Sequence, residues 1–259
     1  MTDVALAAPR PLRLPTVSYG PFRLLEAVPW LMLATALRVV GARGGVSGQL
    51  ADICAEVSVF LAFLLAARRM IEFADGQTGL GRLDFAEQLG LAFKVLIPIL
   101  LLMVVVCAVV ASTGAVWTGL NLLLGFDGIA FDQYTPLGMA WSAFLAALTL
   151  LMVLEAEQSG EANLFARLKE LAQRAACMGP AIVAVAVTHI LLSNVQGAVR
   201  FVLAVFWHTS GAPQTVKNLL FFFFVFGFAS LRLWVTLAIL VFGLRESYRR
   251  GRALPAEPV

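Results

Sequence analysis

The chain has 259 residues, of which 60% are hydrophobic and only 14% are charged, and its formal net charge is +3. Water-soluble domains are about half apolar and a quarter charged, so this chain carries too little charge to cover a globule in water. Disordered chains are poorer in apolar residues and richer in charge, which excludes disorder as well. The composition therefore predicts a polytopic membrane protein.

Charge-free apolar runs of about 20 residues predict membrane-spanning helices, because backbone polar groups in hydrocarbon must hydrogen-bond within their own segment. In chain order, the runs predict six spans, at residues 24–40, 50–67, 95–116, 137–154, 180–196 and 219–244. Glu26, Arg38 and Glu56 lie near the ends of the first two, and the fifth could run on toward Trp207. The expected fold is all-α, a polytopic bundle of about six transmembrane helices.

A cleaved signal peptide is a competing interpretation of the first span. Residues 24–33 could form its apolar region, and Ala34-Thr35-Ala36 has the composition of a cleavage site. The segment before the apolar region would then be 23 residues long, which is unusual for a signal peptide. We therefore favour a retained span, and the other five spans are the same in either case.

Basic residues are distributed unevenly between the two sides of the predicted bundle. One side holds 14 Lys and Arg, which lie in the segment 1–23, in the connections after the second and fourth spans, and in the tail 245–259. The other side holds 4, and Arg232 lies within the sixth span. Cytoplasmic loops carry the excess of Lys and Arg in membrane proteins. Both termini are therefore predicted to face the cytoplasm.

The type of basic residue suggests where this membrane is. Arg outnumbers Lys by 16 to 3, a bias typical of GC-rich bacterial genomes, so the expected location is a bacterial inner membrane. Its basic connections would meet the negatively charged inner leaflet, which makes anionic lipid headgroups the expected partners and not nucleic acid. The expected organisation is a cytoplasmic segment 1–23, a six-span domain 24–244 and a basic cytoplasmic tail 245–259.

The two long cytoplasmic connections share a pattern. Each passes a glycine and enters an amphipathic stretch, 85–89 in one and 165–171 in the other, which predicts short helices lying along the inner leaflet. Pro29, Pro98 and Pro180 each lie near the predicted start of an odd-numbered span, where a proline costs no helical hydrogen bond. A threefold repeat of helical hairpins would explain this pattern, and so would the general frequency of proline at helix starts.

Arg232 is the sharpest candidate site residue, because it lies near the middle of the predicted span 219–244. Charged side chains inside a membrane face the bundle interior or a wet cavity, and they often carry function. The functional interpretation is a site for an anion or a lipid headgroup. The structural interpretation is an ion pair with Glu56 or a hydrogen bond to a neighbouring polar helix.

The fifth predicted span supplies such a polar helix. His189, Ser193, Gln196 and Arg200 lie on one face of it, and a polar face in lipid must turn inward, where it could meet Arg232. His189 could relay protons, because imidazole gains and loses a proton near neutral pH. The structural alternative is a histidine that hydrogen-bonds in helix packing, with Arg200 marking the point where the helix leaves the bilayer.

Other charged groups give weaker signals. Glu56 and Arg38 lie near the outer ends of adjacent spans and could pair across the first hairpin, with a proton or transport site at Glu56 as the alternative. Asp127 and Asp132 lie between the third and fourth spans, and two carboxylates alone make a poor metal site. The three cysteines have no zinc-ligand or disulfide spacing. We expect no metal and no cofactor.

Motifs for nucleotide binding, zinc proteolysis, dithiol redox chemistry and serine hydrolysis are absent from the sequence. The leading hypothesis is a non-catalytic membrane scaffold, assembly factor or subunit of a larger complex, with a membrane protein or a second copy as its partner. The alternative is a small-molecule or lipid transporter with a polar site between the fifth and sixth spans. A membrane enzyme acting on lipid has only scattered acidic residues in its favour.

Overall fold

The computed structural model describes residues 15–17, 24–41, 44–73, 84–112, 136–159 and 162–253. Within these ranges the chain is an all-α bundle, as predicted, with one short β pairing. Its helices are α1 (Val28–Gly41), α2 (Gly45–Met70), α3 (Phe85–Ser112), α4 (Pro136–Ser159), α5 (Leu164–Gln173), α6 (Ala175–Thr209) and α7 (Gln214–Ala253). The pairing, which the sequence did not predict, joins β1 (Pro15–Val17) antiparallel to β2 (Ile71–Phe73), directly after α2.

Five of these helices are long and apolar enough to cross a membrane: α2, α3, α4, α6 and α7. Four of them include a whole predicted span, and α3 includes the described part of its own. The remaining predicted span, 24–40, corresponds to α1, which has 14 residues. At 1.5 Å per residue, α1 is about 21 Å long. The hydrocarbon core of a bilayer is about 30 Å thick, so α1 by itself reaches across about two-thirds of it, and a sixth crossing here would need residues next to α1.

The helix α3 begins well before the predicted start of its span at residue 95. The reason is a reciprocal capping box at its N-terminus. The backbone N of Glu87 donates to Oδ1 of Asp84 over 2.7 Å, and the backbone N of Asp84 donates to Oε2 of Glu87 over 2.9 Å. The stretch 85–89 is therefore the first part of α3 and not a separate interfacial helix. The predicted end of this span, 113–116, lies outside the described residues.

The positions of the prolines agree only in part with the predicted pattern. Pro29 is the second residue of α1, as predicted. Pro98 and Pro180 instead lie inside α3 and α6, because both helices begin upstream of the predicted spans. An interior proline removes one backbone hydrogen bond, and membrane helices tolerate this through local adjustments of neighbouring groups. The predicted continuation of α6 toward Trp207 is confirmed, since this helix ends at Thr209.

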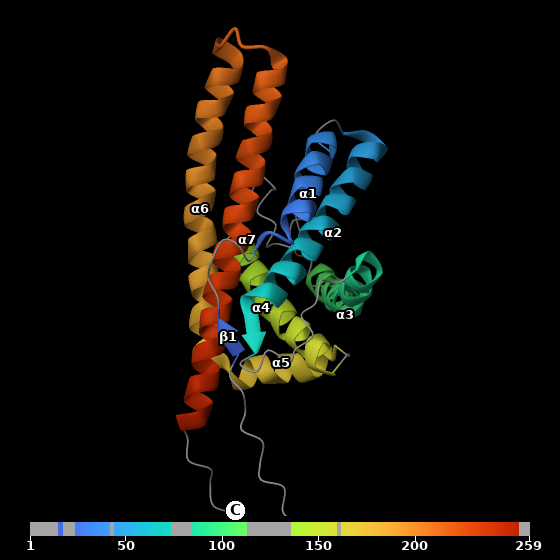
Figure 1. The fold of residues 1–259 in the computed structure, drawn as a ribbon, viewed down its shortest axis with the longest axis vertical. Helices are drawn as coiled ribbons and strands as arrows, with labels where there is room; N and C mark the ends of the chain where they lie inside the picture. Colours follow the sequence, from blue (N-terminus) through green and yellow to red (C-terminus); the bar gives the residue numbers. More distant parts are fainter. Residues whose placement is uncertain are drawn as a thin grey trace, which may run out of the picture.

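The predicted amphipathic helix of the other connection is present as α5. Asn163 caps it, because its Oδ1 accepts a hydrogen bond from the backbone N of Ala166 over 3.1 Å. Arg174, between α5 and α6, donates to Oγ of Ser247 over 3.0 Å and so attaches α5 to α7. Figure 1 shows α5 lying across the base of the bundle. Because α5 is separate and 85–89 belongs to α3, the two connections lack the equivalence that a repeat requires.

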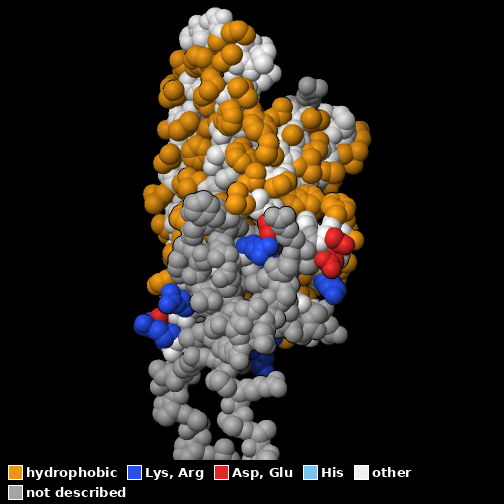
Figure 2. All heavy atoms as spheres, in the orientation of Figure 1, with side chains coloured by type: hydrophobic (Ala, Val, Ile, Leu, Met, Phe, Trp, Pro, Cys, Tyr) orange, Lys and Arg blue, Asp and Glu red, His pale blue; other side chains and the backbone are white. Residues whose placement is uncertain are grey.

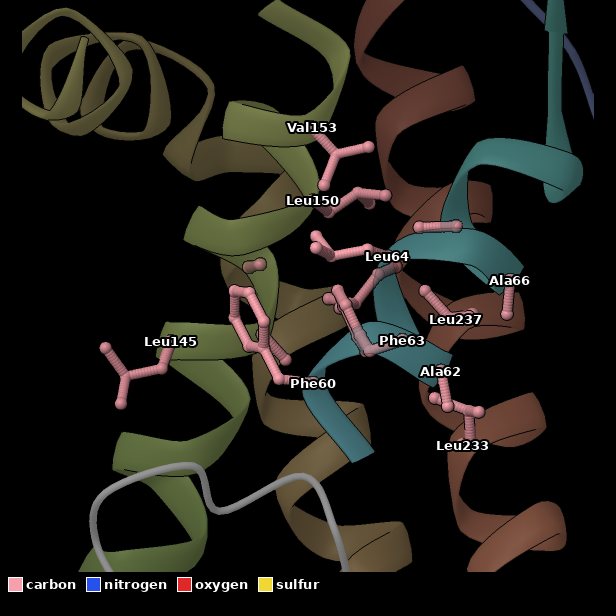
Figure 3. Close-up of a cluster of buried hydrophobic side chains, with 14 of the residues drawn as sticks. Phe60, Ala62, Phe63, Leu64, Ala66, Leu145, Leu150, Val153, Leu233 and Leu237 are labelled. Carbon is pink, nitrogen blue, oxygen red and sulfur yellow. The ribbon is translucent and has the colours of Figure 1, made fainter. Parts of the chain in front are cut away.

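The centre of the bundle is α2, whose residues 59–67 are all buried. This helix contacts α1, α3, α4 and α7. Figure 3 shows α2 between α4 and α7, with Phe60 pointing toward α4 and Ala62 lying beside Leu233 of α7. A helical segment that is apolar on every face is expected to be surrounded, and this central segment of α2 is surrounded by protein, whereas the first turns of the helix expose large apolar side chains.

Two antiparallel hairpins, α1–α2 and α6–α7, give the bundle its shape, and the α6–α7 tip extends beyond the α1–α2 tip (Figure 1). α6 has 35 residues and α7 has 40. Their lengths are therefore about 52 and 60 Å. On the face drawn in Figure 2, hydrophobic side chains cover the upper part, and the described charged side chains in view lie in the lower part. The long hairpin thus carries an apolar surface past the rest of the described bundle.

Candidate intramembrane polar site

Arg232 lies near the middle of α7, and only 1% of its surface is exposed. Its Nη2 donates one hydrogen bond to Oγ of Ser193 over 2.9 Å and another to Oε1 of Gln196 over 2.7 Å. Both acceptors belong to α6. The guanidinium therefore joins the two helices of the long hairpin to each other.

The hydrogen bonds continue one turn along each helix. Oγ of Ser193 donates to the backbone O of His189 over 2.8 Å, and Nε2 of His189 lies 2.7 Å from Oγ1 of Thr236. Since α6 and α7 run antiparallel, residues one turn apart on α6 face residues one turn apart on α7. We call His189, Ser193, Gln196, Arg232 and Thr236 the α6–α7 polar network.

The structure brings together four of the six residues that the sequence singled out. Arg232 hydrogen-bonds to the polar face of α6, which is one of the two structural contacts that the sequence left open. Thr236 was missed, although it lies one turn after Arg232 on the same helix. Arg200 is exposed and lines a cavity near the hairpin tip, one turn beyond Gln196.

Glu56 belongs to a second cluster, near the tip of the α1–α2 hairpin. Arg38 on α1 forms ion pairs with Glu56 and with Asp52, both on α2, and the distance from its Nη1 to Oδ1 of Asp52 is 3.2 Å. The expected contact between Arg38 and Glu56 is confirmed. Asp52 was missed, although it lies one helical turn before Glu56. Arg38 and Glu56 are both partly buried, since the exposed fractions of their side chains are 16% and 22%.

The charged side chains along most of the long hairpin are all basic. The sequence has no Asp or Glu between Glu170 and Glu246, whereas the same stretch contains five basic residues: Arg174, Arg200, Lys217, Arg232 and Arg245. The two described acceptors of Arg232 are accordingly neutral, one a hydroxyl and one an amide oxygen. Hydrogen bonds to a charged donor are stronger than those between neutral groups, so these contacts favour the paired arrangement of α6 and α7.

Within the described ranges, no group of three or more His, Cys, Asp or Glu side chains could hold a metal ion. Asp127 and Asp132 lie outside those ranges. Comparison of the chain with models of protein families, with curated proteins and with solved structures gives no match. What the protein does is therefore inferred from its own residues and their geometry.

Proposed function

We propose that the protein is a non-catalytic membrane scaffold, an assembly factor or subunit that holds a partner within the bilayer. The observation that carries this proposal is that polar side chains of the long hairpin form hydrogen bonds between its two helices. Arg232, 1% exposed, donates to Ser193 and Gln196 and so fixes α7 against α6. Interhelical hydrogen bonds of this kind determine which helices associate in a membrane. The polar network thus supports an architectural role.

The exposed surface of α6 supports the same role. Four large apolar side chains follow one another at intervals of four residues and are each about half exposed: Val183, Val187, Leu191 and Val195. Residues spaced in this way lie on one side of a helix. We call this side the α6 stripe, and we propose that it packs against an apolar helix of a partner membrane protein.

Extraction of the tagged full chain in a mild detergent, followed by mass spectrometry, tests the proposal. We expect one partner to be recovered at a fixed ratio with the native chain. Leu191→Trp would place a bulky side chain on the stripe and should release the partner. Leu231→Trp is the matched control, since Leu231 is an exposed leucine of α7, outside the stripe. Recovery of a lone monomer, or equal behaviour of the two variants, would contradict the scaffold.

A transporter that uses the polar network as its site is the second candidate function. The position of a guanidinium near the middle of α7, the longest described helix, favours it. Arg232→Leu should then abolish the uptake of substrate into reconstituted liposomes. The variant itself should still accumulate in the membrane of the cells that produce it. If the variant fails to accumulate, the structural role of Arg232 is supported instead.

We also propose that both termini face the cytoplasm of a bacterial inner membrane, where the basic connections contact anionic headgroups. The support is the distribution of 14 basic residues on one side and 4 on the other. Reporter fusions after Ala130 should report the outer face, and fusions after Gly160 should report the cytoplasm. The reverse pattern would invert the topology.

A further inference from the structure

A cavity of about 320 Å³ lies between α6 and α7, close to the turn that joins them. Its lining comes from these two helices alone. Arg200, the lining residue nearest to the polar network on α6, lies one turn beyond Gln196 toward the hairpin tip. The cavity therefore begins one turn beyond the α6–α7 polar network, toward the hairpin tip.

Two of the lining residues are positively charged, Arg200 and Lys217, and none is acidic. Basic groups gathered at a low-dielectric wall create a positive potential that attracts anions. Arginine in addition matches the geometry of a phosphate with its fork of N–H donors.

Lys217 is held in place at the cavity. Its Nζ donates to the backbone O of Trp207 over 2.6 Å and lies 6.0 Å from the centroid of the Trp207 ring. An ammonium group has three N–H donors, so further donors are available to a ligand beside the one used for Trp207. Tryptophan and basic side chains at the end of a membrane helix are typical of the level of the lipid headgroups.

The rest of the lining is apolar. Leu203 and Phe206 of α6 face the cavity together with Leu220 and Phe221 of α7. Leu220 is 40% exposed, which shows that this wall reaches the outer surface of the hairpin. The cavity thus combines basic groups with an apolar wall that continues onto a surface of the kind that meets acyl chains.

We infer that this cavity binds an anionic glycerophospholipid from the leaflet in which the α6–α7 turn lies. Arg200 and Lys217 contact the phosphate, and Leu203, Leu220 and Phe221 contact the first part of one acyl chain. Ligand cavities range from about 300 to 1,000 Å³, so this one accommodates the phosphate region and part of a chain and not a whole lipid. The site does not depend on the scaffold proposal, and it lies at the opposite end of the hairpin from the basic tail.

Native mass spectrometry of the full chain tests the inference, with phosphatidylglycerol and phosphatidylcholine of identical acyl chains as probes. We expect phosphatidylglycerol to remain bound and phosphatidylcholine to be lost. Arg200→Gln and Lys217→Gln should each weaken the binding of phosphatidylglycerol roughly fivefold, the usual effect of one basic residue near an anionic membrane surface. Lys169→Gln, which removes an exposed basic residue of α5, is the control and should leave binding unchanged.

A second pair of variants changes the cavity without changing its charge. Ala204 lines the cavity, whereas Ala198 is exposed on α6 outside it. Ala204→Phe should fill the cavity and abolish retention of phosphatidylglycerol, and Ala198→Phe should not. This pair keeps the inference testable even if neutralisation of Arg200 or Lys217 prevents insertion into the membrane.

Four results of the lipid-binding experiments would overturn the inference. They are equal retention of the two lipids, an equal loss of binding in the Lys169→Gln control, displacement of phosphatidylglycerol by inorganic phosphate alone, and displacement by an equal concentration of palmitate. The last would assign the cavity to a free fatty acid. Disulfide-linked dimers of an Ala204→Cys variant in native membranes would place a second copy at the cavity and would likewise overturn it.

Discussion

The α1–α2 and α6–α7 hairpins are both antiparallel helix pairs, but different chemistry holds each of them together. In α1–α2, ion pairs lie near both ends: Arg38 contacts Asp52 and Glu56 near the tip, and Glu26 contacts Arg69 at the base. In α6–α7, a single arginine near the middle hydrogen-bonds to neutral oxygens of α6. The short hairpin is thus joined by pairs of opposite charge, whereas the described acceptors of Arg232 in the long hairpin are neutral.

The surroundings of the two hairpins differ in the same way. α2 is buried through its central turns by α1, α3, α4 and α7. α6 exposes apolar side chains along one side, and its outer end extends past the α1–α2 tip (Figure 1). The short hairpin therefore gains stability from protein packing on several sides. The long one also packs on other helices, α6 on α4 and α7 on α1 and α2, and the polar network adds hydrogen bonds between its own two helices.

The largest effect is expected from Arg38→Leu, which breaks both ion pairs at the α1–α2 tip. It leaves the carboxylate of Glu56, which is 22% exposed, and that of Asp52, which is 44% exposed, without their shared arginine. Loss of one partner from a buried pair costs 3–5 kcal/mol, and the partial exposure of Arg38 places the expected loss in unfolding free energy at about 3 kcal/mol. Unfolding by SDS in mixed micelles measures it.

Arg249→Leu is the control for that experiment. Arg249 also pairs with a carboxylate, that of Glu246, but its side chain is 76% exposed. Exposed ion pairs contribute about 0–1 kcal/mol, so this variant should unfold nearly as the native chain does. Equal losses for Arg38→Leu and Arg249→Leu would show that the tip cluster does not hold the short hairpin together.

A smaller effect is expected from Gly48→Ala, which tests the close approach of α1 and α2. A Cβ at Gly48 would lie 2.8 Å from the backbone O of Gly41, and a backbone atom cannot turn aside as a flexible side chain can. Overpacking of this kind costs 1–3 kcal/mol, so we expect a loss of about 2 kcal/mol in the same unfolding measurement.

Gly227→Ala is the matched control, because a Cβ at this position of α7 would meet nothing within 4 Å. Alanine has the higher helix propensity, so this variant should be stabilised by up to about 1 kcal/mol. A stabilised Gly48→Ala variant would show that the two helices can separate slightly at no cost.

The polar contacts were predictable where helical periodicity and charge coincide. The spacing of His189, Ser193 and Gln196 placed them on one face, and Arg232 was conspicuous as a charge within an apolar run. Thr236 carries no charge and lies among apolar residues, so only its position one turn after Arg232 could have indicated it. Arg200 shares the periodicity of the polar face, yet the part of α7 opposite it contains phenylalanines, which line the cavity with it.

The helix ends were less predictable, because hydropathy reports the thickness of the hydrocarbon core and not where backbone hydrogen bonds begin. α3 starts at a capping box formed by two charged residues, outside the apolar run. α7 likewise continues through the basic tail as far as Ala253. The predicted span at 24–40 begins instead with a turn, in which the backbone N of Ala27 donates to the O of Leu24 over 2.8 Å.

The smallest effect is expected from Gln196→Leu, which removes one acceptor of Arg232 in the long hairpin. Interhelical hydrogen bonds in membranes average about 0.6 kcal/mol with a maximum near 1.7, and a charged donor favours the upper part of that range, so we expect a loss of about 1 kcal/mol. Asn194→Leu, which changes an exposed polar residue of α6 two positions away, should cost much less.

A double-mutant cycle assigns that loss to its cause. If Gln196 stabilises the hairpin by accepting from Arg232, the cost of Gln196→Leu should largely disappear in an Arg232→Met background, where the donor is gone. If the cost persists unchanged, Gln196 acts through packing and the hydrogen bond of 2.7 Å contributes little. The long hairpin would then be held, like the centre of α2, mainly by apolar contacts, and the chemical contrast between the two hairpins would be reduced to the ion pairs of α1–α2.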